Sequence, residues 1–144
     1  MSILESCLFI SAGFLFLVLS LQNSNSLQYM INHKDFAREW INVWNSHDLE
    51  AILSHYSEDI EITTPMISMA TEGKESSLEG KQAVRDYWRK ALEKFPDLHF
   101  ELIQSTAGVD SVALFYKSIM DKQAVEVMFF NEEGKINKMY AHYD

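Results

Sequence analysis

Hydrophobic residues change their spacing along the chain, from a helical period in its middle to an alternating period in its last third. Residues 33–45 and 81–94 each carry apolar side chains at positions i, i+3, i+4 and i+7, the one-sided pattern of an amphipathic helix. In the first stretch these side chains are Phe36, Ala37, Trp40, Ile41 and Trp44. A shorter helix is predicted over residues 49–56, because Asp48 is a suitable N-cap.

Alternating apolar and polar residues predict a strand over residues 60–64 and further strands near the C-terminus. Pro65 ends the first strand because it cannot donate to a sheet, and the polar residues 68–78 predict an irregular loop. The later strands are expected at residues 98–106, 111–120, 124–130 and 135–143. Gly134 lies in the last hairpin loop, in position for a positive φ angle. Helices followed by an antiparallel meander predict an α+β domain.

The strand predicted at residues 124–130 is apolar on both faces. Val125, Val127 and Phe129 share one face, and Met128 lies on the other. A sheet that is apolar on both sides must be covered on both sides. The helices can cover one side and enclose a pocket, so we predict that a second copy of the chain covers the other side, giving a homodimer through the sheet.

Residues 1–29 differ from the rest because all 12 basic residues of the chain lie after them. The apolar run at residues 7–21 is short for a membrane-spanning helix and matches the hydrophobic region of a signal peptide. No basic residue precedes it, however, and Met30 opens a natural start for a domain over residues 30–144, so the alternative is that the preceding segment is a mis-called upstream start. The domain is cytoplasmic if translation starts at Met30, and exported or membrane-associated if the segment is a genuine signal.

Length and charge narrow the classes of protein. A chain of 144 residues has room for one ordinary domain. Its net charge of −9, without a dense stripe of Lys and Arg, argues against nucleic-acid binding. The single cysteine, Cys7, excludes an intramolecular disulfide and a multi-cysteine zinc site. The sequence has no HExxH motif and no phosphate-binding glycine loop, so we expect neither a metal nor a cofactor.

Several motifs resemble those of a SnoaL-like domain. They are WNSHDL at residues 44–49, GKQAV at residues 80–84, FNEEGKI at residues 130–136 and the terminal HYD. SnoaL-like domains belong to the NTF2-like superfamily, which includes steroid Δ-isomerases and polyketide cyclases. The resemblance implies an NTF2-like cone over residues 30–144, with three N-terminal helices packed on a curved antiparallel sheet around a pocket.

The steroid isomerases imply roles for individual positions. Their general base is an aspartate just before the proline that ends the first strand, and here that position is Thr64, which cannot abstract a proton near neutral pH. Their oxyanion hole pairs a helix tyrosine with a protonated strand acid, and these positions resemble Trp40 and Glu126. Two further pocket aromatics resemble Trp88 and Tyr143. The resemblance thus implies that this chain has the pocket wall of the steroid isomerases but lacks their general base.

Glu126 is the main candidate for catalysis. Valines flank it in an apolar strand, so we expect its pKa to be raised, unless it is solvated or paired with Lys117 or Lys138. His142 is a second candidate, as an acid–base partner of Glu126. If alternation is strict, however, His142 and Tyr143 face opposite sides of the sheet, and His142 then belongs to the dimer face.

Methionines and a phenol complete the predicted pocket wall, namely Met66, Met128, Met139 and Tyr116. Two functions fit this pocket. The first is a cofactor-independent enzyme, an isomerase or cyclase type, that transfers a proton on a small apolar molecule through Glu126. The second is a non-catalytic protein that binds a hydrophobic ligand or serves as a dimeric association module. A membrane is a partner only if residues 1–29 are retained.

Overall fold

The computed structural model describes residues 32–144, and His33 to Asp144 form one compact unit. The predictions for residues 1–29, a signal peptide or an upstream start, lie outside the described residues. Among the residues described, no helix combines the length and the apolar character needed to cross a membrane.

The described residues form helices first and most of the strands afterwards. The helices are α2 (His33–Asn45), α3 (Leu49–Leu53), α4 (Pro65–Ala70), α5 (Lys81–Lys94) and the 3-10 turn η1 (Ile119–Asp121). The strands are β1 (Tyr56–Thr63), β2 (Ser77–Glu79), β3 (Glu101–Ala107), β4 (Ser111–Lys117), β5 (Gln123–Phe130) and β6 (Ile136–Tyr143). Helices α2 and α5 have the bounds that the hydrophobic spacing predicts. Strands β5 and β6 each start within one residue of the predicted start.

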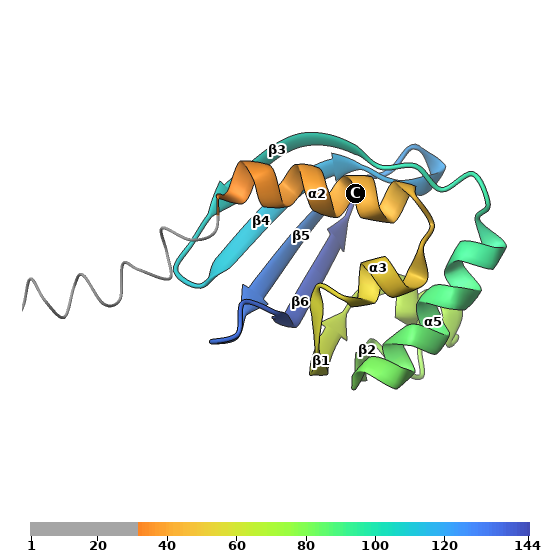
Figure 1. The fold of residues 1–144 in the computed structure, drawn as a ribbon. Coiled ribbons are helices and arrows are strands. Elements are labelled where there is room, and N and C mark those ends of the chain that lie inside the picture. Colours follow the sequence, from red (N-terminus) through yellow and green to blue (C-terminus); the bar gives the residue numbers. More distant parts are fainter. Residues whose placement is uncertain (1–31) are drawn as a thin grey trace, which may run out of the picture. The chain divides into compact units, whose positions relative to one another are not determined.

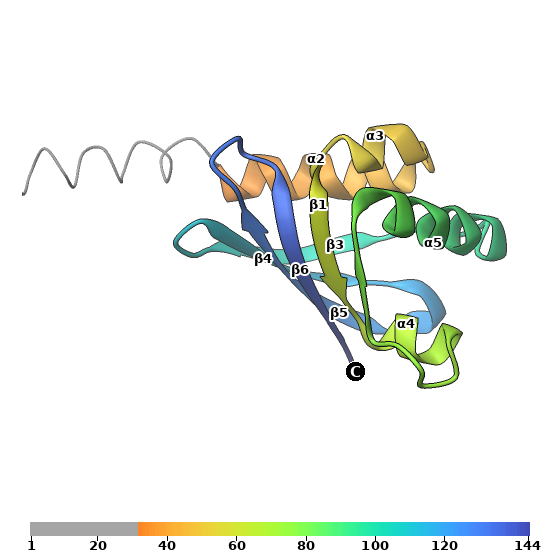
Figure 2. The ribbon, with the colours of Figure 1, turned by 90° about the horizontal axis from the view of Figure 1, so that it is seen from below.

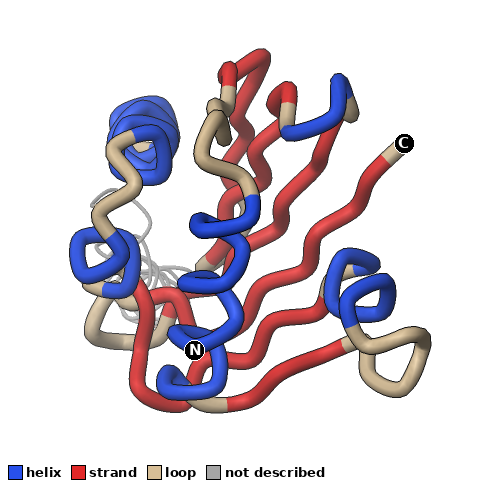
Figure 3. The backbone as a smooth tube through the Cα atoms, turned by 90° about the vertical axis from the view of Figure 1, so that its right-hand side faces the viewer, coloured by secondary structure: helices blue, strands red, loops and turns tan. Residues whose placement is uncertain are grey.

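The strands form one six-stranded sheet in the order β2-β1-β6-β5-β4-β3. Neighbouring strands are antiparallel except β1 and β6, which run parallel. Figures 1 and 3 show the strands as one continuous, curved layer. Gly134 has a φ of 73° in the hairpin between β5 and β6, as predicted. The predicted α+β fold, helices packed on a curved and mainly antiparallel sheet, is confirmed.

The helices cover the inner face of the sheet. Helix α2 lies across the strands and packs against β3, while α5 packs against β1 (Figure 1). Seen from below, α4 lies beyond the end of β1, apart from α3 (Figure 2). On β4, Val112, Leu114 and Tyr116 are buried because alternate side chains point toward these helices. The core therefore lies between the helices and the inner face.

The Asn-Ser-His-Asp turn after α2 has a structural role. The Asn45 side chain accepts a hydrogen bond from the Phe100 backbone N–H at 2.7 Å and donates to the Phe100 carbonyl at 2.9 Å. A ring nitrogen of His47 contacts the Leu98 carbonyl oxygen at 2.7 Å. Asp48 then caps α3 with its side chain. The turn therefore fastens the chain entering β3 to the end of α2.

Residues 68–78, predicted as a loop, instead contain the end of α4 and the start of β2. Helix α4 forms because Thr64 Oγ1 accepts a hydrogen bond from the Met66 N–H at 3.2 Å, and Pro65 fits the first helical position. The predicted second helix is also shorter than expected, because β1 already starts at Tyr56 and pairs there with β6.

The outer face of the sheet points away from the helices. Val125 and Phe129 on this face are exposed in the described chain. Glu126 and Met128 share one face, as the alternation predicts, and both are buried on the inner side of the sheet. The homodimer through the outer face stays a prediction, since the structure describes a single chain.

Candidate functional site

A cavity of about 340 Å³ lies between the helices and the inner face of the sheet. Small-molecule sites usually occupy ~300–1,000 Å³. The cavity wall comes from α2, α4, α5, β4, β5, β6 and η1, and from the segment that leads into β3. The residues singled out from the sequence that line it are Trp40, Thr64, Met66, Trp88, Tyr116, Glu126, Met139 and Tyr143.

Glu126 is the one buried carboxyl group among the described residues, with a side chain only 4% exposed. Strand β5 places it opposite Leu114 on β4 and Ala141 on β6. Tyr116, two positions further along β4, lies on the same face and donates a hydrogen bond from its hydroxyl to Glu126 Oε2. Strand alternation thus brings a carboxyl and a phenol together at the cavity.

Burial raises the pKa of Glu126 from its ordinary 4.5 to about 7, although the hydrogen bond from Tyr116 by itself lowers this pKa. In the described part of the chain Glu126 makes no ion pair. The two lysines considered as its partners bind elsewhere, Lys117 to Glu101 at 3.1 Å and Lys138 to Glu61 at 3.3 Å. The alternative of a lysine-paired Glu126 is therefore wrong, and the carboxyl can gain or lose a proton near neutral pH.

Tyrosine hydroxyls near Glu126 remain protonated around neutral pH. Burial, and after it the negative charge of Glu126, raises the pKa of Tyr87 to about 12. The same two causes raise the pKa values of Tyr116 and Tyr143 above the ordinary 10.0. All three side chains line the cavity, so they are hydrogen-bond donors at any pH at which the protein is expected to work.

Two tryptophans of α2 line the cavity and differ in their hydrogen bonding. The Trp40 indole donates to the Tyr56 hydroxyl at 2.9 Å, and Tyr56 donates to the Met139 sulfur at 3.8 Å. Burial raises the pKa of Tyr56, and the hydrogen bond from the Trp40 indole lowers it in part. The Trp44 Nε1–H, however, is a buried donor without a hydrogen-bond partner among the described residues. The donor that the resemblance assigned to an oxyanion hole, Trp40, is thus engaged within the fold.

Thr64 is the position that the resemblance aligns with the general base of the steroid isomerases. Its side chain is 6% exposed and lines the cavity. The hydroxyl oxygen accepts the hydrogen bond that starts α4, and a threonine hydroxyl is too weak a base to take a proton from carbon near neutral pH. Thr64 therefore positions α4 at the cavity wall.

Two residues proposed for the site lie outside the cavity wall. His142 pairs in register with Val125 on the outer face and is exposed, whereas Tyr143 lines the cavity. The suggested acid–base dyad of Glu126 and His142 is therefore wrong, because the pleat directs the two side chains to opposite faces. Met128 is fully buried but belongs to the apolar core beside the cavity, which corrects its assignment to the pocket wall.

The cavity wall also includes residues that the sequence analysis did not assign to it. Among them are Trp44, Phe100, Tyr87, Lys90 and Lys94. The three on α5 are spaced by three and four positions, which places them on one stripe of the helix. That spacing was a readable signal, whereas the position of Phe100 depends on the Asn-Ser-His-Asp turn after α2.

The arrangement is suited to proton transfer in an apolar environment. Among the described residues, no three His, Cys, Asp or Glu side chains are grouped to hold a metal ion. Glu126 supplies a group whose pKa of about 7 lies near neutral pH, and the phenol groups of Tyr87 and Tyr143 are suited to donate hydrogen bonds to a ligand oxygen. The remaining wall is mainly apolar, so it fits a small molecule with few polar groups.

The free energy of unfolding is expected to fall by about 2 kcal/mol between pH 5.5 and 8.5 through Glu126. Its pKa is higher in the folded state, about 7 against 4.5, so the folded state binds the proton more tightly. This contribution is complete below pH 4.5 and is lost as the pH rises through 7. Urea unfolding across this range measures it, and Glu126→Gln is the control, because its amide does not titrate. Equal pH dependence in both chains would contradict the raised pKa.

The comparisons with known proteins agree with this fold. A sequence model of the SnoaL-like domain matches residues 37–138. A SnoaL-like protein of unknown function from Burkholderia thailandensis E264 is 47% identical and has a TM-score of 0.74; the match covers 78% of this chain and 94% of that chain. Among curated proteins, none is significantly similar to this chain.

Two more distant structures share the fold. A candidate isomerase of the SnoaL-like family from Agrobacterium tumefaciens C58 is 20% identical, with a TM-score of 0.62 over 78% of this chain and 97% of that chain. SalBIII, an epoxide hydrolase/cyclase-like enzyme in pyran ring formation in the polyether salinomycin, is 24% identical, with a TM-score of 0.60 over 78% of this chain and 90% of that chain. At these identities the likeness concerns the fold alone.

Proposed function

The chain belongs to the SnoaL-like family, and we propose that its cavity binds a small apolar carbonyl compound and moves a proton on it through Glu126. One observation carries this proposal: a carboxyl group with a pKa of about 7 is buried in the wall of a mainly apolar cavity. General acid–base catalysis is most efficient when the pKa of the catalytic group is near the working pH.

The proposed reaction balances without a co-reactant. Glu126, as a carboxylate, accepts a proton from the carbon next to the substrate carbonyl, and an enolate forms. The resulting carboxylic acid returns the proton to the same carbon or to another carbon of the enolate, which regenerates Glu126. Tyr143 lines the cavity, and its hydroxyl is the donor that we propose for the oxygen on which negative charge develops.

Ligand binding without catalysis is the second candidate function. The observation in its favour is Thr64, which serves as the N-cap of α4 at the position that the resemblance aligns with the steroid-isomerase base. In this case the Glu126–Tyr116 pair acts as a hydrogen-bonding anchor for a ligand oxygen. The two functions share the cavity and differ in whether the proton of Glu126 moves to carbon.

Exchange of ketone α-protons in D₂O distinguishes the two functions. The full chain is mixed with small cyclic ketones, and the loss of the α-proton signals is followed by NMR. The enzyme function predicts exchange faster than in buffer, with a rate that rises with pH through about 7 as Glu126 becomes a carboxylate. Ketone binding without faster exchange would support the second function, and the absence of both would contradict both.

A further inference from the structure

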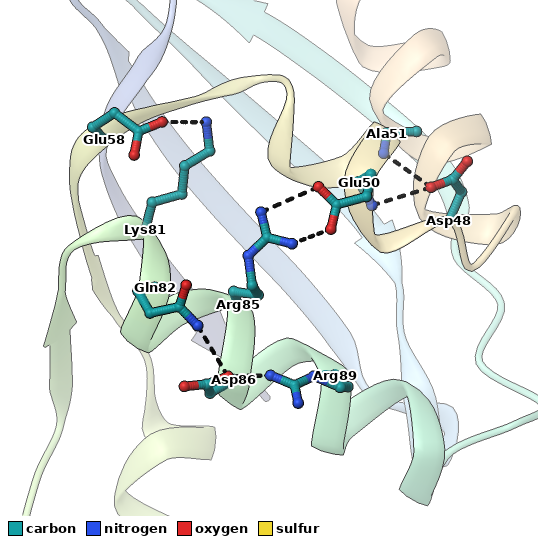
Figure 4. Close-up of polar contacts among 9 residues, drawn as sticks. All are labelled: Asp48, Glu50, Ala51, Glu58, Lys81, Gln82, Arg85, Asp86 and Arg89. Atoms are coloured by element: carbon teal, nitrogen blue, oxygen red, sulfur yellow. Dashed lines mark hydrogen bonds and ion pairs between the residues drawn. The ribbon is translucent and has the colours of Figure 1, made fainter.

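Helix α5 carries five cationic residues, and they divide between two sides of the helix. Three of them pair with acids, as Figure 4 shows: Lys81 with Glu58 at 3.0 Å, Arg85 with Glu50 at 3.1 Å through Nη2 and Oε2, and Arg89 with Asp86. The other two, Lys90 and Lys94, line the cavity. Within the described part of the chain, neither of them makes an ion pair.

The position of these two lysines is not explained by helix stability alone. Cations near a helix C-terminus are favourable, and Lys94 is the last residue of α5. That effect depends on the position along the helix and not on the side of it. It therefore does not explain why both lysines lie with Tyr87 on the side of α5 that lines the cavity. Lys94 also lines an adjoining depression with Asp97 and Asp121, whereas Lys90 lines only the main cavity.

Charge is distributed by depth in the cavity wall. Glu126 is buried at the sheet, whereas Lys90 and Lys94 are exposed. The chain as a whole carries a net charge of −9, so its overall field repels anions. Two cations without ion pairs in the cavity wall oppose that field locally. A molecule that fits both ends needs an apolar body, an oxygen for the inner donors and a negative charge at its outer end.

We propose that the natural ligand is an amphiphilic anion whose apolar body fills the cavity and whose carboxylate or comparable anionic group is bound by Lys90 and Lys94. This inference rests on the proposed function, because it assigns a charge to the same ligand. It predicts that the protein distinguishes two ligands with equal apolar bodies by their charge.

A matched pair of fluorescent probes tests the charge preference. The anionic probe is 8-anilinonaphthalene-1-sulfonate, and N-phenyl-1-naphthylamine has the same aromatic body without the sulfonate. Replacing both lysines, K90Q and K94Q, is expected to weaken sulfonate binding about fivefold, as for two exposed ion pairs, and to leave binding of the neutral probe within about twofold. The K74Q variant, in which an exposed lysine outside the cavity wall is replaced, is the matched control and should bind both probes like the natural chain.

The outcomes separate this inference from the proposed function. Added salt should weaken binding of the sulfonate only, and only while both lysines are present. Equal effects of the double variant on both probes would overturn the inference and leave the apolar site standing. If the natural chain binds the neutral probe and not the sulfonate, the inference alone is overturned; if it binds neither probe, the proposed function is overturned as well. Sulfonate binding that survives Ala91→Trp, which fills the cavity, would place the anion outside it and also overturn the inference.

Discussion

A Glu126→Gln chain is expected to exchange ketone α-protons at least ~100-fold more slowly than the natural chain. Glutamine has nearly the same shape as glutamate, but its amide oxygen cannot take a proton from carbon. It can still accept the hydrogen bond that the Tyr116 hydroxyl donates to this position, so the fold should be retained. Exchange rates at pH 8 and at saturating ketone, compared with ketone affinity, separate the loss of proton transfer from the loss of binding.

The matched control is Glu101→Gln, the same change on an exposed strand, where the carboxylate pairs with Lys117. This variant should exchange protons at the natural rate. A second variant, Tyr116→Phe, removes the hydrogen bond that lowers the pKa of Glu126, so its pH–rate profile should move to higher pH. An unchanged rate in Glu126→Gln would show that another group moves the proton.

The sequence predicted the long elements because their hydrophobic patterns are strong and local. Helices α2 and α5 each present a continuous apolar stripe, and the structure reproduces the bounds predicted for both. Alternation also predicted that Glu126 and Met128 share one face of β5, which pairs regularly with both neighbours at these residues, while the resemblance implied that this face lines the pocket. These features can be predicted without knowing which elements pack together.

Short elements escaped prediction because contacts distant in sequence define them. Strand β2 has three residues and exists because it pairs with β1, and the start of β1 at Tyr56 depends on its parallel pairing with β6. Helix α4 did have a local signal, Thr64 followed by Pro65, but the proline was interpreted only as the end of a strand. The same dipeptide supports both interpretations.

The candidate site was predictable in its residue types and less so in its hydrogen bonds. An acid between valines indicated a buried carboxyl, and the structure places Glu126 in the cavity wall. The hydrogen bond that Trp40 donates to Tyr56 could not be predicted. It joins α2 to the first residue of β1, and the local pattern predicted that this strand starts only at residue 60. The outward direction of His142 was one of two open possibilities, and the pairing of β6 with β5 decided between them.

Trp40→Ala is expected to be the most destabilising single substitution in this domain, at about 3–5 kcal/mol. The side chain is 2% exposed and packs between Phe100, Trp44 and Tyr116, with ring centroids 5.6–5.9 Å away. Its removal leaves a cavity in this cluster and also deprives the Tyr56 hydroxyl of its donor. Chemical unfolding at pH 6 measures the loss, which is a large part of the ~5–15 kcal/mol stability typical of a domain.

A matched pair of milder variants separates the hydrogen bond from the packing. Trp40→Phe and Trp44→Phe remove the same atoms from two buried indoles one turn apart on α2. The Trp40 N–H has a partner, whereas the Trp44 N–H has none among the described residues. Trp40→Phe should therefore cost about 1–2 kcal/mol more in the free energy of unfolding than Trp44→Phe, because it alone breaks a buried hydrogen bond. Equal losses would mean that the bond from Trp40 to Tyr56 adds nothing to stability, and that aromatic packing alone holds α2 on the sheet.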